Sequence, residues 1–276
     1  MSPAESDELK KVAAELRGRI IVTSCKAKVP HLGSCLSCVD ILVTLYWRTL
    51  NIDPQNPKAE DRDRFLLSKG HAAPALFQLL AMRGFFPLSD LDHYGVDGSL
   101  FAEHPPAHGV PGVEAATGSL GHGLPIGTGM ALASRIKNNA NKTVVLMSDG
   151  ECNEGSVWEA AMFAASQKLE RLVAIIDFNK WQATGRSQEV MAIDPFKEKW
   201  QAFGWSSYEV DGHDIVALED LLSKLPDGSG KPVAIIAHTI KGKGVSFMED
   251  NNNWHYRTPK PEEVVAARKE LGLTKS

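Results

Sequence analysis

The sequence lacks a long apolar run, a block of basic residues and a dense set of cysteines. No apolar stretch reaches the ~20 consecutive residues that span a bilayer, and residues 1–11 are polar and acidic, unlike a signal peptide. Lysine and arginine total 30 against 34 aspartate and glutamate residues, giving a formal net charge of −4. We therefore predict neither nucleic-acid nor membrane binding, and we expect a soluble cytoplasmic protein.

The four cysteines offer no framework for a metal site. Cys35 and Cys38 form a lone CxxC pair, and Cys25 and Cys152 stand apart from it. Structural zinc usually requires a second ligand pair at compact spacing, and none is obvious. Because the CxxC lies inside an apolar helical pattern, we predict small buried thiols, with a redox or metal role as the alternative.

What the chain does contain is 276 residues, 43% of them hydrophobic, arranged as alternating helices and short apolar strands. This alternation predicts an α/β fold with a mainly parallel central sheet, flanked by helices on both faces. The length allows one large α/β domain or two small ones. The predicted strands are 143–148, 172–178, 206–210 and 232–238. The predicted helices are 9–28, 36–50, 72–83, 88–94, 123–135, 157–167, 194–203, 215–225 and 261–271.

Several segments read as loops or turns. Residues 61–67 lead into a turn at 68–71, and 185–190 and 241–254 are predicted loops. The stretch 95–112 is rich in glycine, proline and histidine, and such long irregular segments are usually functional or disordered. Glycines 123, 127 and 129 recur on one predicted helix, which indicates close packing against a neighbouring helix or another subunit.

Two polar residues follow two consecutive predicted strands. Asp149 comes after 143–148 and Asn179 follows 172–178, so they lie 30 positions apart (179 − 149). Oxygen ligands at the carboxyl ends of neighbouring parallel strands can converge on Mg²⁺ and an attached phosphate. Gly150 would let a phosphate approach the backbone. Glu151 and Glu154 follow at once, and acidic residues at a helix N-terminus are favourable because they interact with the helix dipole. We expect at least one of the two carboxylates to have a further role.

Five histidines lie beside glycine, proline or tryptophan in predicted loops or at helix starts. They are His31, His71, His104, His122 and His255. A single such histidine is more often an ordinary loop residue, but five indicate function. Neutral imidazoles can bind a diphosphate and move protons near pH 7.

With these residues identified, the chain resembles the thiamine-diphosphate-binding half of transketolase, from about residue 10 to the C-terminus. It is most similar to the free-standing subunits found where transketolase is split over two chains. The resemblance implies a single diphosphate-binding domain over 1–276. The motifs that carry the resemblance, besides Asp149-Gly150 and Asn179, are His31-x-Gly33, Leu67-Ser-Lys-Gly-His71, Glu103-His-Pro105, Thr117-Gly-Ser-Leu-Gly121, His238-Thr-Ile-Lys-Gly-Lys-Gly244 and Trp254-His255.

The resemblance implies a role for each matching residue. Mg²⁺ would be bound by Asp149, Asn179 and the backbone carbonyl of Trp181, with Gly150 contacting a phosphate. The other implied cofactor-binding residues are His71 and His255, beside the diphosphate and thiazolium, Gly118 and Leu120, along the aminopyrimidine, and Glu154, at the subunit boundary. The implied catalytic residues, which bind sugar hydroxyls and move protons, are His31, His71, His104 and His255.

The resemblance implies a transketolase reaction, and it implies that this chain carries only one of the two domains that form the active site. A two-carbon ketol unit would pass from a ketose (phosphate) donor to an aldose (phosphate) acceptor through thiamine diphosphate. The glutamate that activates the cofactor belongs to a second, pyrimidine-binding domain, for which 276 residues leave no room. We expect that domain on a separate partner chain, in a heterotetramer of two copies of each.

Three positions depart from the commonest pattern: Ser148 replaces a glycine, His122 a glutamine and Tyr256 a glycine. The ring of Tyr256 could alter acceptor choice, so an unusual modified sugar is one alternative substrate. A second alternative concerns the reaction: the chain could belong to a different thiamine enzyme, either the α subunit of a 2-oxoacid dehydrogenase or a deoxyxylulose-phosphate-synthase-like protein. The histidine motifs favour ketol transfer instead. A third alternative is a non-catalytic scaffold. A Mg²⁺-dependent phosphatase or kinase would need a nucleophile or a phosphate-binding loop, and the sequence contains no GxxxxGK[ST] motif.

Overall fold

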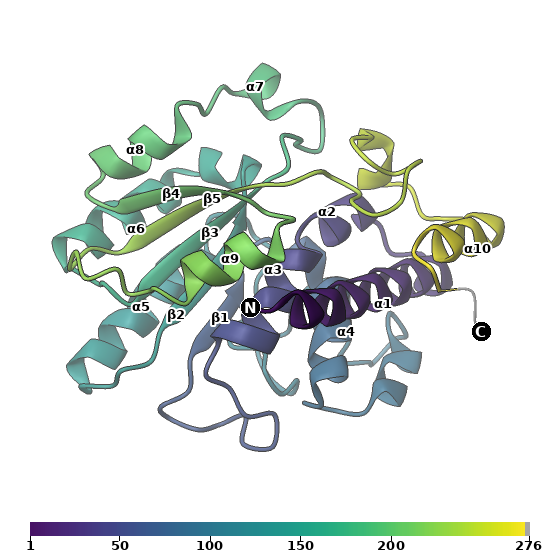
Figure 1. The fold of residues 1–276 in the computed structure, drawn as a ribbon, viewed down its shortest axis with the longest axis horizontal. Helices are drawn as coiled ribbons and strands as arrows, with labels where there is room; N and C mark the ends of the chain where they lie inside the picture. Colours follow the sequence, from purple (N-terminus) through teal and green to yellow (C-terminus); the bar gives the residue numbers. More distant parts are fainter. Residues whose placement is uncertain (274–276) are drawn as a thin grey trace.

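The computed structural model describes residues 1–273 and shows a five-stranded parallel sheet (Figure 1). The strand order is β1-β2-β3-β5-β4, and every neighbouring pair is parallel. The strands are β1 Arg64–Leu67, β2 Thr143–Ser148, β3 Leu172–Phe178, β4 Ser206–Asp211 and β5 Val233–His238. The predicted class is confirmed, and β1 is the strand that the sequence pattern did not reveal.

The central strands are buried on both faces, as their continuous apolar runs require. In β2, Val144 and Leu146 face one hydrophobic core, whereas Val145 and Met147 face the other. Helices α1, α3, α4 and α9 cover the first face, and α5, α6 and α8 cover the second (Figure 1). The prediction of helices on both faces is confirmed. Burial of each aliphatic side chain in these cores contributes about 1.5–3 kcal/mol to the free energy of folding.

The helices follow the predicted order with shifted ends. They are α1 Pro3–Ala27, α2 Leu32–Ser37, α3 Val39–Thr44, α4 Ala73–Arg83, α5 Gly123–Ile136, α6 Gly155–Ser166, α7 Ser187–Val190, α8 Phe196–Ala202, α9 Ile215–Leu222 and α10 Pro261–Glu270. Helix α1 starts earlier than predicted because Ser2 and Glu5 form a capping box around its first turn.

Three local predictions are wrong. The single helix expected over 36–50 is α2, α3 and a π-helical turn, Leu45–Thr49. The loop expected over 185–190 contains the one-turn helix α7, and the loop over 241–254 runs into a 3-10 turn, Asn252–His255. The stretch 95–112, in contrast, contains neither helix nor strand, as expected.

Close packing explains two of the three glycines on α5. A Cβ on Gly123 would lie 2.1 Å from Ser68 Oγ, and one on Gly127 would lie 2.5 Å from Val145 Cγ2. Both glycines therefore let α5 pack tightly, against β2 and the turn after β1 rather than against the helix or subunit that we expected. Gly129 faces open space, so packing within the described chain does not explain it.

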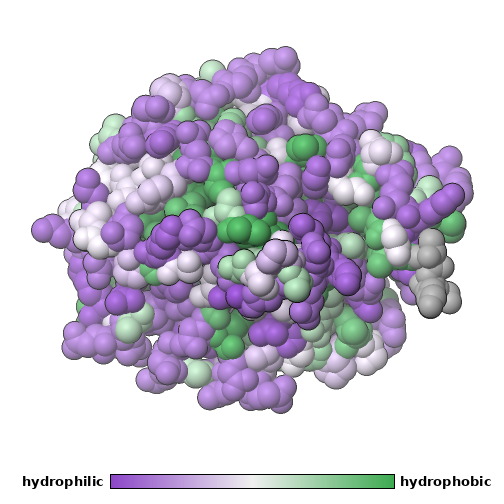
Figure 2. Space-filling model, viewed as in Figure 1, coloured by the Kyte–Doolittle hydropathy of each residue, from purple (hydrophilic) through white to green (hydrophobic). Residues whose placement is uncertain are grey.

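Burial of the thiols is confirmed for Cys35, Cys38 and Cys152, while Cys25 is partly exposed. Burial raises the pKa of Cys38 to about 11, so this thiol stays protonated at neutral pH. Within residues 1–273, no helix is long and apolar enough to cross a membrane. Hydrophilic residues cover most of the face seen in Figure 2, and apolar ones show in smaller groups between them.

Candidate active site

A pocket of about 300 Å³ lies beyond the carboxyl ends of the strands, where ligands bind in open α/β sheets. Most of the predicted site residues line it, although they come from segments spread over more than 200 positions. The lining residues are His31, Ser34, His71, His104, Gly118, Leu120, Ser148, Gly150, Asn179, Trp181, Gln182, Ala183 and His255. A larger cavity of about 640 Å³ lies between α1, α4 and residues 88–96 and contains none of the predicted residues.

Asp149 lies directly behind this pocket, where β2 ends. Its side chain is 1% exposed, and its carboxylate accepts hydrogen bonds from Gly150 N (2.9 Å), Lys180 N (3.0 Å) and Ser187 Oγ (2.7 Å). Burial raises the pKa of Asp149 to about 6, against the opposing effect of these hydrogen bonds. A buried carboxylate with a raised pKa is a site where a bound cation would be strongly favoured.

The end of β3 supplies the second predicted metal ligand. Asn179 is 3% exposed, and its Oδ1 accepts a hydrogen bond from Trp181 N at 3.1 Å. The indole of Trp181 donates to Asp250 (2.7 Å), and the guanidinium of Arg186 stacks over the same ring at 3.8 Å. These contacts brace the loop after β3, so the Trp181 backbone is held beside Asn179.

Two glycines in the pocket wall let neighbouring side chains approach the backbone closely. Gly118 has φ +146°, and a Cβ there would lie 2.6 Å from Cδ2 of His104. A Cβ on Gly150 would lie 3.0 Å from Cγ of Gln182. A larger residue at position 118 would therefore strain the backbone and displace His104.

The opposite side of the pocket is formed by histidines. The ring centroid of His31 lies 5.2 Å from that of His71 and 4.9 Å from that of His255. Burial lowers the pKa of His31 to about 4 and that of His255 to about 3, and it also lowers the pKa of His71 well below its usual value. All three imidazoles are consequently neutral at pH 7.

A buried ion pair below the pocket was not predicted. Lys69 and Asp177 are fully buried and form a salt bridge, and Asp177 also accepts hydrogen bonds from Ser37 and Thr239. Although burial opposes it, the lysine holds the pKa of Asp177 below its usual value. The only sequence signal was position: Lys69 stands inside the Ser-Lys-Gly-His motif and Asp177 is a charged residue in an apolar strand.

Lys241 was likewise missed as a site residue. It is fully buried, and its ammonium lies 2.9 Å from Nδ1 of His255 and donates to Oδ1 of Asn252 at 2.7 Å. Burial, followed by repulsion from Lys69, lowers the pKa of Lys241 to about 8. Its position inside the motif from His238 to Gly244 was the available signal.

The two glutamates after Gly150 have different environments. Glu151 is fully buried and accepts hydrogen bonds from Ser68 Oγ, Gly121 N (2.9 Å) and Ser148 N (3.2 Å). It therefore ties the glycine-rich segment to the end of β2, which is more than filling a helix N-terminus. Glu154 is exposed at the start of α6 and does not line the pocket, so its predicted boundary role stays a prediction.

The donors around Asp149 fit a magnesium ion that shares its ligands with a phosphate. Among residues 1–273, no group of three or more His, Cys, Asp or Glu side chains could hold a metal alone. One carboxylate, one amide oxygen and one backbone carbonyl leave positions for phosphate oxygens, and Mg²⁺ is commonly held this way.

Comparison with known proteins decides the family. The family model "Transketolase, thiamine diphosphate binding domain" matches residues 10–276. The chain belongs to the transketolase family. The resemblance seen in the sequence is thereby confirmed.

Curated transketolase relatives include subunits of similar length. The chain is 42% identical over 266 residues to an apulose-4-phosphate transketolase subunit of Actinobacillus succinogenes, with 96% of each chain covered. It is also 42% identical over 224 residues to the 6-deoxy-6-sulfo-D-fructose transketolase subunit SqwG of a Clostridium species, covering 81% of this chain and 82% of that one.

Solved transketolase structures share the fold. The transketolase of Leishmania mexicana superposes with a TM-score of 0.90 at 28% identity. The match covers 96% of this chain but only 41% of that one, so this transketolase chain spans less than half of the solved protein.

Proposed function

We propose that the chain is the diphosphate-binding subunit of a two-chain transketolase that depends on thiamine diphosphate and Mg²⁺. It would transfer a two-carbon ketol unit from a ketose (phosphate) donor to an aldose (phosphate) acceptor. The observation that carries the proposal is the pocket in which the four predicted histidines meet Gly118, Leu120, Gly150, Asn179 and Trp181. Family membership over residues 10–276 supports it.

The strand ends would hold the charged end of the cofactor. Asp149, Asn179 and the carbonyl of Trp181 would bind Mg²⁺, and Gly150 would contact a phosphate through its backbone N–H. Gly118 and Leu120 would lie along the aminopyrimidine. When bound, thiamine diphosphate supplies the carbon nucleophile that carries the two-carbon unit.

The histidines would handle the sugar and its protons. Because the Lys241 ammonium donates to Nδ1 of His255, Nε2 of this ring carries the proton and can donate to a hydroxyl or an oxyanion. His31 and His104 would bind other hydroxyls of the sugar, and His71 would lie beside the cofactor. Low pKa values keep His31 and His71 neutral, so each ring has an unprotonated nitrogen that can accept a proton when a hydroxyl loses one.

A partner chain would complete the site. Relatives that match nearly the whole chain are named as subunits of a transketolase, which supports a separate second chain. We propose that this second chain carries the pyrimidine-binding domain with the activating glutamate, in a heterotetramer. Exposed Glu154, at the start of α6, would lie at the boundary between the two chains.

A modified sugar is the second candidate substrate, and Tyr256 favours it. This side chain is 65% exposed, and its ring lies 4.7 Å from the ring of His255 and 5.9 Å from that of His31. It therefore reduces the space beside two histidines that would bind sugar. The relatives named for apulose-4-phosphate and 6-deoxy-6-sulfo-D-fructose support the same candidate.

The test is reconstitution with the pyrimidine-binding transketolase subunit of the same organism. Both chains would be co-expressed and supplied with thiamine diphosphate and Mg²⁺. Donors would be xylulose 5-phosphate, apulose 4-phosphate and 6-deoxy-6-sulfo-fructose, each paired with an aldose phosphate, and mass spectrometry would follow two-carbon transfer.

Transfer that requires both chains, and that Asp149→Ala abolishes, is the expected result. Unchanged transfer with Asp149→Ala would favour a scaffold role for this chain. Absence of cofactor binding in the complex would overturn the proposal. Which donor is used decides between ordinary and modified sugars.

A further inference from the structure

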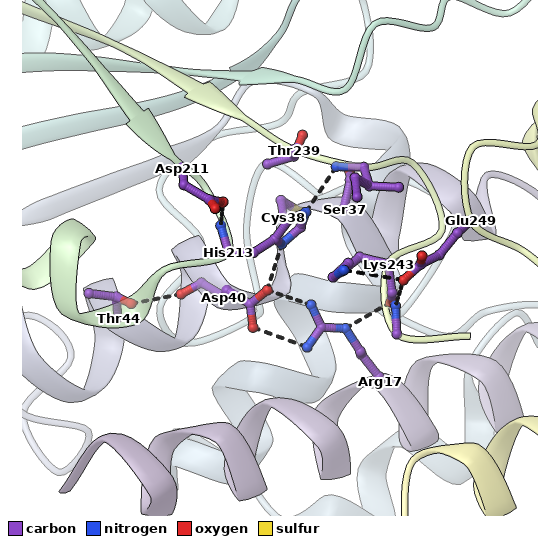
Figure 3. Close-up of polar contacts among 12 residues, drawn as sticks. Arg17, Ser37, Cys38, Asp40, Thr44, Asp211, His213, Thr239, Lys243 and Glu249 are labelled. Atoms are coloured by element: carbon purple, nitrogen blue, oxygen red, sulfur yellow. Dashed lines mark hydrogen bonds and ion pairs between the residues drawn. The ribbon is translucent and has the colours of Figure 1, made fainter. Parts of the chain in front are cut away.

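A buried network of Arg17, Asp40 and His213 lies beside the segment that carries Lys241 (Figure 3). The three residues come from helix α1, helix α3 and the connection between β4 and α9. Arg17 and Asp40 are each 6% exposed, and the side chain of His213 is 13% exposed. None of them lines the pocket, and none of the roles proposed above uses them.

Asp40 is the centre of the network. Its carboxylate accepts two hydrogen bonds from the guanidinium of Arg17, at 3.0 and 2.6 Å, and lies 2.7 Å from Nδ1 of His213. Burial opposes ionisation, but Arg17 and His213 together hold the pKa of Asp40 below its usual value. The aspartate therefore stays charged and fixes the orientation of both partners.

The outer atoms of the network hold one backbone segment at two points. Nε2 of His213 accepts a hydrogen bond from Ile240 N at 2.9 Å, and Nε of Arg17 donates to the carbonyl of Lys243 at 2.9 Å. Since Nε2 is an acceptor, the proton of His213 lies on Nδ1 and points to Asp40. Lys241 stands between these two points of attachment.

Lys241 connects this segment to the pocket. Its buried ammonium contacts Nδ1 of His255, whose ring lies 4.9 Å from that of His31. A shift of residues 240–243 would move the ammonium and change which nitrogen of His255 carries the proton. Interactions that fix a ring's tautomer in this indirect way commonly change ligand affinity by about 10- to 100-fold at metal sites.

We propose that Arg17, Asp40 and His213 are positioning residues that fix Lys241 and, through it, the tautomer and orientation of His255. A role in stability alone is the competing explanation, because a buried ion pair is weak evidence for function. Two features favour positioning: the network supplies one acceptor and one donor to the backbone on either side of Lys241, and both are directional. The consequence for catalysis rests on the proposed function.

The test uses two replacements of His213, each of which keeps one of its two hydrogen bonds. His213→Asn places an amide near Nδ1, so it keeps the contact with Asp40 and loses the acceptor for Ile240 N. His213→Gln reaches the position of Nε2 and restores that acceptor. His238→Asn is the matched control, since His238 pairs with Glu209 at an exposed position on the same sheet edge.

The first readout is the tautomer of His255, measured by ¹⁵N NMR on the full chain with labelled histidine and no cofactor. The signal would be assigned from the spectrum of His255→Asn. The second readout is the affinity of the two-chain complex for thiamine diphosphate with Mg²⁺, measured by calorimetry. The NMR readout decides on the network even if the complex binds no cofactor, so failure of the proposed function is recognised separately.

We expect His213→Asn to convert His255 from the Nε2-protonated form to a mixture and to weaken cofactor binding about tenfold. His213→Gln should restore both to within about threefold, and His238→Asn should change neither. An unchanged tautomer in folded His213→Asn would overturn the proposal, as would a Gln variant with as large a loss as the Asn variant.

A second pair of variants covers a failure of His213→Asn to fold. Arg17→Lys keeps a charge beside Asp40 but removes the donor to Lys243 O. Lys243→Ala removes a neighbouring side chain and leaves that carbonyl in place. A changed His255 tautomer in Arg17→Lys but not in Lys243→Ala supports the proposal, and equal spectra in both variants contradict it.

Discussion

The two sides of the pocket have opposite electrostatic requirements. At the strand ends, burial raises the pKa of Asp149, and within residues 1–273 no lysine or arginine forms an ion pair with it. On the histidine side, burial and the nearby Lys69 and Lys241 lower the pKa of His31 and His255. The carboxylate at the strand ends therefore has no cationic partner among the described residues, whereas protonation of the histidines to cations is disfavoured.

Under the proposed function, this difference suits a ligand with two unlike ends. A metal-bound anionic group fits the strand ends, and a neutral, hydroxyl-rich group fits the histidines. Lys69 acts on both sides, because its charge opposes protonation of Asp149 and of the imidazoles alike. The buried Lys69–Asp177 pair is thus a shared support for two regions that otherwise differ.

The largest expected effect comes from breaking that shared support. Lys69→Met leaves the carboxylate of Asp177 buried without its cation, and removal of one partner of a buried pair costs about 3–5 kcal/mol of folding free energy. Urea unfolding followed by tryptophan fluorescence would measure the loss.

Lys243→Met is the matched control for this loss. Its ion pair with Glu249, at 3.3 Å, is about one-third exposed on each side, so its removal should cost less than about 1 kcal/mol. Equal unfolding midpoints for Lys69→Met and the wild type would show that the pair does not stabilise the fold.

The sequence predicted residues on both sides of the pocket, because the signals of those residues are local in the chain. Strands β2 and β3 were located because apolar runs end in Asp149 and Asn179, and the histidines were noticed beside glycines and prolines. Strand β1 was missed because it has only four residues and begins with arginine.

The supporting residues could not be found in this way. Lys69 and Asp177 are separated by 108 positions, Asp40 and His213 by 173, and Arg17 and Lys243 by 226. No short-range pattern signals such pairs, because only the packed sheet and helices bring them together. Motifs therefore revealed residues that would face the ligand and missed those that hold them.

The second prediction concerns the side that lacks a cation. Asp149→Asn keeps the size of the side chain and removes its charge, so Mg²⁺-dependent affinity for thiamine diphosphate should fall at least about 100-fold. The melting temperature of the cofactor-free chain should not fall, since the variant no longer buries an unpaired carboxylate. Calorimetry with and without Mg²⁺ measures the first effect, and a thermal melt measures the second.

Asp53→Asn, in an exposed turn far from the strand ends, serves as the control. A parallel loss of affinity and melting temperature in Asp149→Asn would mean that the carboxylate is structural. Unchanged affinity would remove Asp149 from the metal site.

The third prediction concerns pH and the histidine side. The folded-state pKa values of about 4 for His31 and about 3 for His255 lie below the usual 6.5, so between these limits the unfolded chain binds more protons. This contribution to stability is therefore complete above pH 6.5 and is lost as the pH falls towards 4. His31→Asn should flatten the decline in melting temperature over this window.

Exposed His122 provides the comparison, because His122→Asn should leave the pH dependence as in the wild type. Melting curves at several pH values between about 7.5 and 4.5 would separate the two variants. The same slope in His31→Asn and wild type would indicate that folding does not lower the pKa of His31, contrary to the electrostatic contrast drawn above.

The smallest effect is expected at the edge of the histidine side, where Tyr256 packs on the rings of His31 and His255. In the two-chain complex, Tyr256→Gly should lower KM for a bulky acceptor about threefold with kcat unchanged, because it removes a steric contact that substrate and transition state share. Tyr256→Phe keeps the ring and should behave as the wild type. If kcat instead fell at constant KM, the ring would be needed to orient His255, and Tyr256 would join the positioning residues rather than determine acceptor choice.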